Sequence, residues 1–572
     1  MGAMSGPPSR WPPVLDPRGR VERRAQPLAP RPDAARLRRG PVLLYDNGKL
    51  AEGAYPAVFQ RLRELLAGAG VPDVIERREP IRGASVDELR ERARALAATG
   101  AVAAVLALAD VGVSPATARL TIALEAEGLP AVCLSADPGD ALARAVAFYQ
   151  AGALGLVRLD LVPDADDAAV RAATDRAWPA ILEGLSSPAA TLAERWRAVL
   201  PLDATAPSAD GLLDVTPWLE GDAADPEAWH DGVLAAFSAL RIGDGLPLVP
   251  PTPRRYAAIL AFAPWPPAAP LVRDLGPAGA TLTVRELAVA AVMAGCRPEQ
   301  FPIVVTAVRA MARPEFNLLQ ALTTSHNSGH LLIVSGPLAA AAGMHGGAGC
   351  LGPGFPANAA IGRAVNLALV NVGRAVPGVS DLGCLGSPAE WTYCFAEAAG
   401  PWPTLNAERF DAEATTVFAL KAEPPHGVTD FRSRTAEDLL GTLLDCCTSL
   451  GSNNAFMPGS LVLVLAPDHA RLLAGAGWHK AALRERIHAG ASHDARALAP
   501  RGIAAIAPRP GADGRVRATR SPRDVEIVVA GGRGGHSAVI RPWSLSSEAV
   551  VEPVRRPDGA LAHSIAELRA IR

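Results

Sequence analysis

The sequence predicts an α/β protein: a small parallel-sheet N-terminal domain followed by a larger mixed α/β (α+β) C-terminal region. Apolar runs alternate with amphipathic stretches from Pro41 to Ser135, which is typical of a parallel sheet covered by helices on both faces. A less regular stretch at 186–226 then separates this series from a second one. The chain has 572 residues, 49% hydrophobic and 20% charged, which is enough to build several cores.

Four short apolar runs are predicted to be the strands of the first sheet. Helical periodicity lies between and after them, and we expect Ser114 to be the N-cap of one of these helices. Ligands of such sheets bind beyond the carboxyl ends of the strands, here at 46–48, 110–114 and 135–137. The predicted strands are 41–45, 71–76, 101–109 and 130–135, and the predicted helices are 55–67, 86–98, 114–127 and 168–182.

The remaining segments divide the chain into five parts. Residues 1–40 are rich in Pro and Arg and are predicted to be a disordered leader. The other predicted parts are the first domain at 41–185, a linker at 186–226, the larger region at 227–545 and a C-terminal tail at 546–572. In the larger region we expect helices at 229–240, 287–295, 299–313 and 359–372, strands at 247–251, 330–335, 413–419, 460–466 and 524–530, and a loop at 489–521.

Composition excludes several classes of protein. The 56 basic and 58 acidic residues give a net charge of −2, whereas nucleic-acid-binding domains usually carry a basic excess. The longest apolar run, 101–109, is too short to span a membrane, and the N-terminal residues lack the pattern of a signal peptide. The 7 cysteines are irregularly spaced, as suits a reducing compartment. We therefore expect a cytoplasmic protein that acts on a small-molecule substrate and binds neither nucleic acid nor a membrane. The composition leaves open whether the protein forms a homo-oligomer.

Three residues are candidates for catalysis. Cys296 lies between two predicted helices and next to an arginine, and both features lower the pKa of a thiol. His326 and His536 lie in polar or glycine-rich loops next to strands, where either could carry a proton. A metal held by His326, His330 and His345 is a less favoured alternative. No cofactor is predicted, because the glycine-rich segments lack the strand–turn–helix frame of a dinucleotide-binding fingerprint.

A glycine-rich segment at 346–354 is the candidate for holding an anionic substrate. Its glycines allow a ligand to approach the backbone, and Asn358 and Arg363 follow at the start of an apolar helix. An ordinary glycine-rich surface loop is an equally good interpretation. The complete set of predicted substrate-binding residues is Glu299, Ser328, Gly346, Gly347, Gly349, Asn358, Arg363, Tyr393, Asn453, Asn454 and Ser537.

Several of these motifs resemble the UGSC family of selenoprotein-like proteins, which is named for a motif of selenocysteine or cysteine, Gly, Ser and Cys. The resemblance extends over most of residues 41–545. The runs that carry it are 46–49, the strand before Asp110, 124–130, 244–252, 293–299, 352–354, 357–359, 361–364, 393–397 and 535–540.

The resemblance implies that the redox motif of the family would follow Asp110. The chain has Val111 and Ser114 where the two chalcogen residues would stand, and of the motif only Gly112 is kept. A dithiol or selenothiol cycle needs two chalcogen atoms, so this redox chemistry cannot run at 111–114. The N-terminal domain is then expected to be a structural or ligand-binding remnant.

Three functions remain open at this point. The favoured one is an enzyme of small-molecule metabolism, with specialised or sulfur-related metabolism included, whose site in the C-terminal region uses a thiol or a histidine. The first alternative is a thiol oxidoreductase that pairs Cys296 with a second cysteine, Cys394 or Cys350. The second alternative is a non-catalytic binding or partner subunit.

Overall fold

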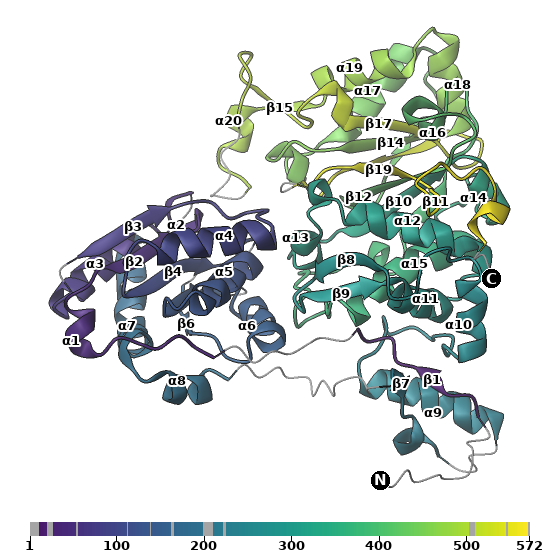
Figure 1. The fold of residues 1–572 in the computed structure, drawn as a ribbon. Coiled ribbons are helices and arrows are strands. Elements are labelled where there is room, and N and C mark those ends of the chain that lie inside the picture. Colours follow the sequence, from purple (N-terminus) through teal and green to yellow (C-terminus); the bar gives the residue numbers. More distant parts are fainter. Residues whose placement is uncertain are drawn as a thin grey trace.

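The computed structural model describes residues 11–19, 27–52, 55–71, 73–110, 112–137, 139–161, 165–197, 210–220, 225–502, 509–544 and 547–569. A small N-terminal domain, drawn in purple and blue, lies beside a larger region in teal, green and yellow (Figure 1). The predicted fold class is confirmed, because a parallel sheet comes first in the chain and mixed sheets follow it.

The N-terminal domain is a doubly wound, five-stranded parallel sheet of order β3-β2-β4-β5-β6. Successive side chains of a strand point to opposite faces, so Leu43 and Leu44 belong to different cores. One core packs against α3 and α7, and the other packs against α4 and α5. The elements are β2 (Val42–Asp46), α3 (Ala57–Gly68), β3 (Val74–Arg78), α4 (Val86–Ala97), β4 (Ala103–Ala109), α5 (Ser114–Ala126), β5 (Ala131–Ser135), α6 (Gly139–Gln150), β6 (Leu156–Arg158) and α7 (Asp167–Ser186).

The larger region is built from two four-stranded sheets packed face to face between two layers of helices. The first sheet has the order β11-β10-β12-β19 and the second β13-β18-β14-β17. Their strands are β10 (Gly329–Ser335), β11 (Cys394–Ala396), β12 (Thr416–Ala422), β13 (His426–Thr429), β14 (Leu461–Leu465), β17 (Val525–Val529), β18 (His536–Ile540) and β19 (Val550–Pro553). The covering helices are α11 (Val284–Met293), α12 (Phe301–Met311) and α15 (Pro356–Asn371) on one side and α17 (Ala436–Cys447), α18 (Pro467–Gly475) and α19 (Lys480–Gly490) on the other.

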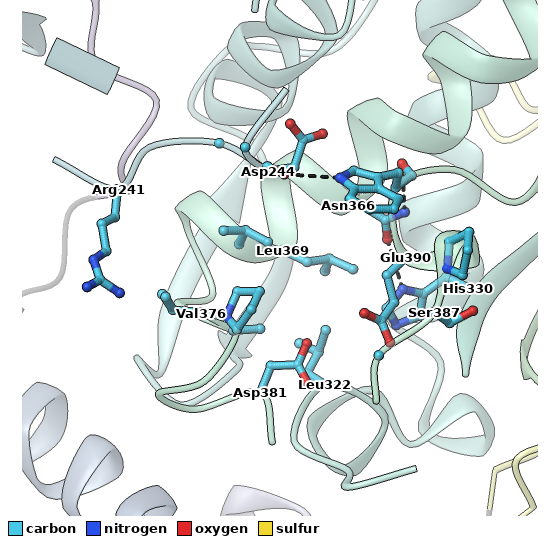
Figure 2. A pocket seen from close by; sticks show the side chains of 18 of the residues that line it. Arg241, Asp244, Leu322, His330, Asn366, Leu369, Val376, Asp381, Ser387 and Glu390 are labelled. Carbon is cyan, nitrogen blue, oxygen red and sulfur yellow. Dashed lines mark hydrogen bonds between the residues drawn. The ribbon is translucent and has the colours of Figure 1, made fainter. Parts of the chain in front are cut away.

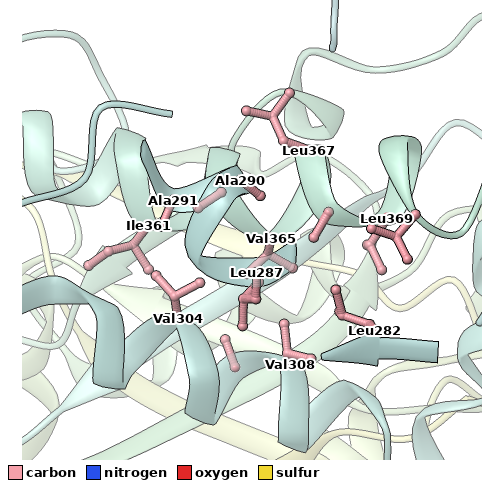
Figure 3. Packing of buried hydrophobic residues seen from close by; sticks show 14 of the residues in the cluster. Leu282, Leu287, Ala290, Ala291, Val304, Val308, Ile361, Val365, Leu367 and Leu369 are labelled. Atoms are coloured by element: carbon pink, nitrogen blue, oxygen red, sulfur yellow. The ribbon is translucent and has the colours of Figure 1, made fainter. Parts of the chain in front are cut away.

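Alternation along β10 shows how these layers arise from the sequence. Leu331 and Ile333 pack between the two sheets, whereas Leu332 and Val334 pack against the helices. The helix-side core is dense and apolar: Leu287, Val304 and Val365 meet in it from three helices (Figure 3). A strand that is buried on both faces has no polar positions to alternate with apolar ones, which explains its continuous apolar run.

Several segments outside the two domains are more ordered than expected. Among the residues assigned to the disordered leader, β1 (Val14–Leu15) pairs with β7 (Leu212–Leu213), and α1 (Ala34–Leu37) packs on the first domain. The expected linker holds α8 (Ala189–Arg195) besides β7, and the expected tail holds β19. Residues 1–10 and 20–26 of the expected leader, 198–209 and 221–224 of the expected linker, and 546 and 570–572 of the expected tail lie outside the described residues.

Some predicted elements differ from the structure. Residues 247–251 form no strand, because three of the five are prolines, which cannot donate to a ladder, and the segment joins no sheet. The expected loop 489–521 contains a short hairpin of β15 (Ser492–Asp494) and β16 (Arg515–Arg517) with α20 (Ala495–Leu498) between them. The sequence interpretation also missed α6, β6 and β18, whose small or polar residues hide their periodicity.

The two domains touch through a turn of the larger region. Buried Arg119 of α5 donates hydrogen bonds to the carbonyl oxygens of Asp274 and Gly276, at 3.2 and 2.8 Å. These carbonyls belong to the hairpin of β8 (Pro270–Leu275) and β9 (Ala280–Thr283). Gln150, at the end of α6, donates to Pro277 of the same hairpin at 2.8 Å. The hairpin thus fixes the small domain through main-chain acceptors.

Candidate functional site

A cavity of about 710 Å³ lies where the start of β10 and the end of β12 meet α15. The loops 241–245 and 375–391 complete its wall. Leu322, Leu369 and Val376 supply apolar surface, and His330, Ser387 and Glu390 gather on one side of it (Figure 2). A volume of several hundred cubic ångströms with a few polar groups on an apolar wall is typical of small-molecule sites.

His330 is the best-defined polar group of the cavity. It is 7% exposed, and its Nδ1 lies 2.9 Å from Oδ1 of Asn366 on α15. The amide nitrogen of Asn366 donates to the carbonyl oxygen of Trp391 at 3.3 Å, so its Oδ1 must face the imidazole as an acceptor. His330 therefore carries its proton on Nδ1, and Nε2 is left as a lone-pair acceptor with no partner among the described residues.

Electrostatics keep this imidazole neutral. Burial lowers the pKa of His330 well below its ordinary value, and the positive charge of Lys421 lowers it further. The two residues lie opposite each other in the antiparallel β10–β12 pair, on the helix side of the sheet. At neutral pH the site thus offers an unprotonated Nε2 that can accept a proton.

Lys421 is the second polar group of the cavity. Its side chain is 4% exposed overall, and burial lowers its pKa to about 8, against the opposing charges of Asp381 and Glu390. Burial in turn raises the pKa of Asp381 and of Glu390, because a carboxylate is costly to desolvate. The cavity therefore combines an amine and two carboxyl groups whose pKa values are shifted toward neutral pH with an imidazole whose pKa is lowered. A cluster of shifted pKa values in a cavity is the pattern of functional sites.

The mouth of the cavity is tied down by an ion pair. Arg363 of α15 donates to both carboxylate oxygens of Asp244 at 2.7 and 2.8 Å, and the indole of Trp391 donates to the carbonyl oxygen of Asp244 at 3.0 Å. Arg363 was predicted to hold an anionic substrate. Its guanidinium instead binds the 244–247 turn to α15 through the carboxylate of Asp244 and the carbonyl oxygen of Pro247.

The thiol candidate has the wrong electrostatics for a nucleophile. Cys296 follows α11 as expected, but burial raises the pKa of its thiol, the opposite of the shift that a thiolate requires. The same is true of Cys394, whose pKa is raised by burial and also by its neighbour Cys296. These two thiols are thus near each other, yet neither environment favours the reactive form.

Alkylation should separate these cysteines. We expect iodoacetamide to modify the exposed Cys384 at least about tenfold faster than Cys296 in the native protein at neutral pH, because only Cys384 is exposed. Mass mapping of peptides after short labelling times, over a range of pH, measures this ratio. Faster labelling of Cys296 would restore the thiolate hypothesis.

The other two catalytic candidates lie outside this cavity. His326 faces a separate hollow of about 270 Å³, with its Nε2 3.5 Å from a carboxylate oxygen of Glu423. His536 is exposed on β18, where its ring meets Phe431 edge-on at 4.9 Å. The ring of His345 stacks on that of Phe355, with their centroids 3.9 Å apart. Among the described residues no three His, Cys, Asp or Glu side chains are grouped as metal ligands would be.

The glycine-rich segment 346–354 is held by its own structure. Asn358 accepts from the main-chain nitrogen of His345 and donates to the carbonyl oxygens of His345 and Cys350, which uses its whole amide. A Cβ on Gly346 would stand 2.4 Å from the carbonyl oxygen of Ala396. Close packing against backbone thus requires a glycine at 346, and positive φ angles of +72° and +100° favour glycine at 349 and 354.

The remaining predicted binding residues are dispersed. Tyr393 donates to the carbonyl oxygen of Glu423 at 3.1 Å, Asn454 donates to that of Cys447 at 2.9 Å, and Ser537 lies 2.7 Å from Nδ1 of His469. The structure gives them no common site with Cys296. Glu299 forms an ion pair with Arg297, and Ser328 is buried. Asn453 donates to the carbonyl oxygen of Trp543. Gly347 and Gly349 belong to the glycine-rich segment 346–354.

A second place for a ligand lies in the N-terminal domain, at the switch point between β2 and β4. Asn47 ties the two strand ends together by donating to Leu108 and Thr117, and Lys49 lies 3.4 Å from Asp110. Ser114 is the first residue of α5 and not its N-cap, which is Val113. Val111 lies outside the described residues. The polar groups that are described here already bind one another.

Comparison with known proteins gives one match. The model of the UGSC family matches residues 13–186, which span the described N-terminal domain. No curated protein and no solved structure matches the chain. Within the described ranges, no helix has both the length and the apolarity to cross a membrane. The similar motifs of the larger region lie beyond the match and stay a prediction, so the shown similarity to the UGSC family is that of residues 13–186.

Proposed function

We propose that the chain is an enzyme of small-molecule metabolism whose active site is the cavity between β10, β12 and α15, with His330 as its general base. The observation that carries the proposal is the orphaned Nε2 of His330, a neutral acceptor oriented by Asn366 in a cavity of about 710 Å³. A histidine-assisted site in the C-terminal region agrees with the sequence interpretation, although the histidine is a different one.

The reaction that this arrangement suits is proton abstraction from a bound organic molecule. Nε2 would take the proton, and the nearby ammonium of Lys421 would stabilise the negative charge left on the substrate. Asp381 or Glu390, with raised pKa values, could return a proton. General acid–base catalysis of this kind contributes about 10²–10⁴-fold to a rate.

The substitution His330→Gln tests the proposal. A metabolite extract is incubated with the protein, and mass spectrometry identifies compounds that the wild type consumes. We expect His330→Gln to consume them about 10²–10⁴-fold more slowly while still binding them, because glutamine keeps a polar group but is no base. His230→Gln, on the exposed side of α9 (Pro226–Ala239), is the matched control and should behave as wild type.

Two results would contradict it. If wild type and His330→Gln consume the compound at equal rates, His330 is not the general base. Binding of a compound in the cavity without any turnover supports the second candidate, a non-catalytic binding subunit, which the altered motif at Gly112–Ser114 favours.

A further inference from the structure

Resting on the proposed function of the cavity, we propose that Lys421 is a nucleophile that forms an imine with an aldehyde or ketone bound there. Its amine lines the cavity opposite His330, beside the carboxyl groups of Asp381 and Glu390. Carbonyl compounds with an apolar body are the substrate class that this inference assigns to the enzyme.

The other lysines of the chain show what is particular to Lys421. The sequence has only Lys49, Lys421 and Lys480. Lys49 lies 3.4 Å from a carboxylate oxygen of Asp110, and Lys480 lies 2.9 Å from one of Glu408. Among the described residues, no carboxylate lies within ion-pairing distance of Lys421, although it is as buried as Lys480.

A buried amine without an ion-pair partner loses its proton more easily. Burial lowers the pKa of Lys421 to about 8, so about one molecule in ten has a neutral amine at pH 7. The charged or titratable groups that face it are His330 from β10 and Asp381 and Glu390 from the 375–391 loop. The neutral amine is the form that attacks a carbonyl carbon.

The neighbouring groups can complete the reaction. The lone pair of Nζ attacks the carbonyl carbon while the C=O π electrons move to oxygen, and His330 Nε2 takes one proton from nitrogen and passes it to the alkoxide, which gives a neutral carbinolamine. Asp381 or Glu390 then protonates the hydroxyl, which leaves as water while the nitrogen lone pair forms the C=N bond. The carboxylate left by this step takes the second proton from nitrogen, which gives the neutral imine and restores the acid. Amine and carbonyl are thus converted to imine and water, with no oxidant or reductant.

The walls decide which carbonyl compounds fit. Leu322, Leu369 and Val376 line the interior, and Leu385 and Trp391 present apolar surface to solvent at the edge of the cavity. Apolar side chains that are exposed beside a cavity favour a substrate with a hydrophobic body over a small, highly hydrated one. We therefore expect hexanal to react better than glyoxylate.

Reductive trapping tests the inference. The full-length protein is incubated with hexanal and sodium cyanoborohydride, which reduces an imine to a stable secondary amine, and digested peptides are mapped by mass spectrometry. We expect Lys421 to gain a hexyl group at least about tenfold faster than Lys49 and Lys480, with a rate that rises from pH 6 to about 8. In Lys421→Arg, which keeps a positive charge at this position, the hexyl group on residue 421 should be absent, and labelling of Lys49 and Lys480 should be unchanged.

The outcomes separate the two proposals. The proposal that Lys421 is a nucleophile is overturned if Lys49 or Lys480 is labelled preferentially. It is also overturned if neither aldehyde forms an adduct with Lys421. If Lys421 is not labelled but His330→Gln still slows consumption of a compound, the proposed function stands without an imine. If Lys421 is labelled and no compound is consumed in a manner that depends on His330, the amine is nucleophilic but the proposed function fails.

Discussion

Replacement of Glu125 by alanine is expected to lower the free energy of unfolding of the N-terminal domain by about 3–5 kcal/mol. Glu125, near the end of α5, is 5% exposed and accepts from both terminal nitrogens of Arg31 at 2.8 and 2.6 Å. The main-chain nitrogens of Ala29 and Ala131 also donate to it. Its loss leaves a buried guanidinium without its carboxylate partner and two buried N–H groups without their acceptor.

Hydrogen exchange of peptides from β4 and β5, measured in urea, reports the stability of this domain within the full chain. Glu127→Ala is the matched control, two residues further along. Its side chain is 37% exposed and lies 3.5 Å from that of Arg94, 65% exposed, and such surface pairs contribute about 0–1 kcal/mol. Equal losses from the two variants would show that the buried pair contributes nothing particular.

Leu287→Ala should destabilise the larger region by about 2–5 kcal/mol. Leu287 on α11 is fully buried in the helix-side core, where it meets side chains of α12 and α15 (Figure 3). Alanine leaves a cavity that α12 and α15 can close only in part, because both helices also pack against the first sheet.

Urea unfolding followed by tryptophan fluorescence measures this loss through the shift of the midpoint. The control is Leu385→Ala, at a side chain that is 86% exposed, and its expected change is within about 0.5 kcal/mol. A similar midpoint for Leu287→Ala and wild type would mean that the core relaxes around the missing atoms.

The strands buried on both faces were the most predictable part of the fold. Runs such as those of β4 and β14 are apolar throughout and end within two residues of the predicted bounds. The β12 strand was placed three residues early, at 413–419 instead of Thr416–Ala422. Which sheet a strand joins depends on contacts far apart in sequence, so the face-to-face packing of two sheets could not be predicted.

Most residues of the candidate site could not be predicted from the sequence. His330 was noticed only as a metal ligand, and Lys421, Asp381 and Glu390 were missed. Their meeting depends on the β10–β12 register and on a loop some forty residues away from the strand. One signal was present: a lysine inside an apolar strand, in a chain with three lysines, costs free energy to bury and therefore calls for a reason.

The pairing of β1 with β7 has a consequence for how the chain unfolds. These strands flank the small domain in sequence, so the domain leaves and re-enters the larger region at one place. If the small domain melts alone, its chain stays tied at both ends as a closed loop, and a loop has fewer conformations than a free tail. This short ladder thereby acts on the melted state as a cross-link does, without a covalent bond.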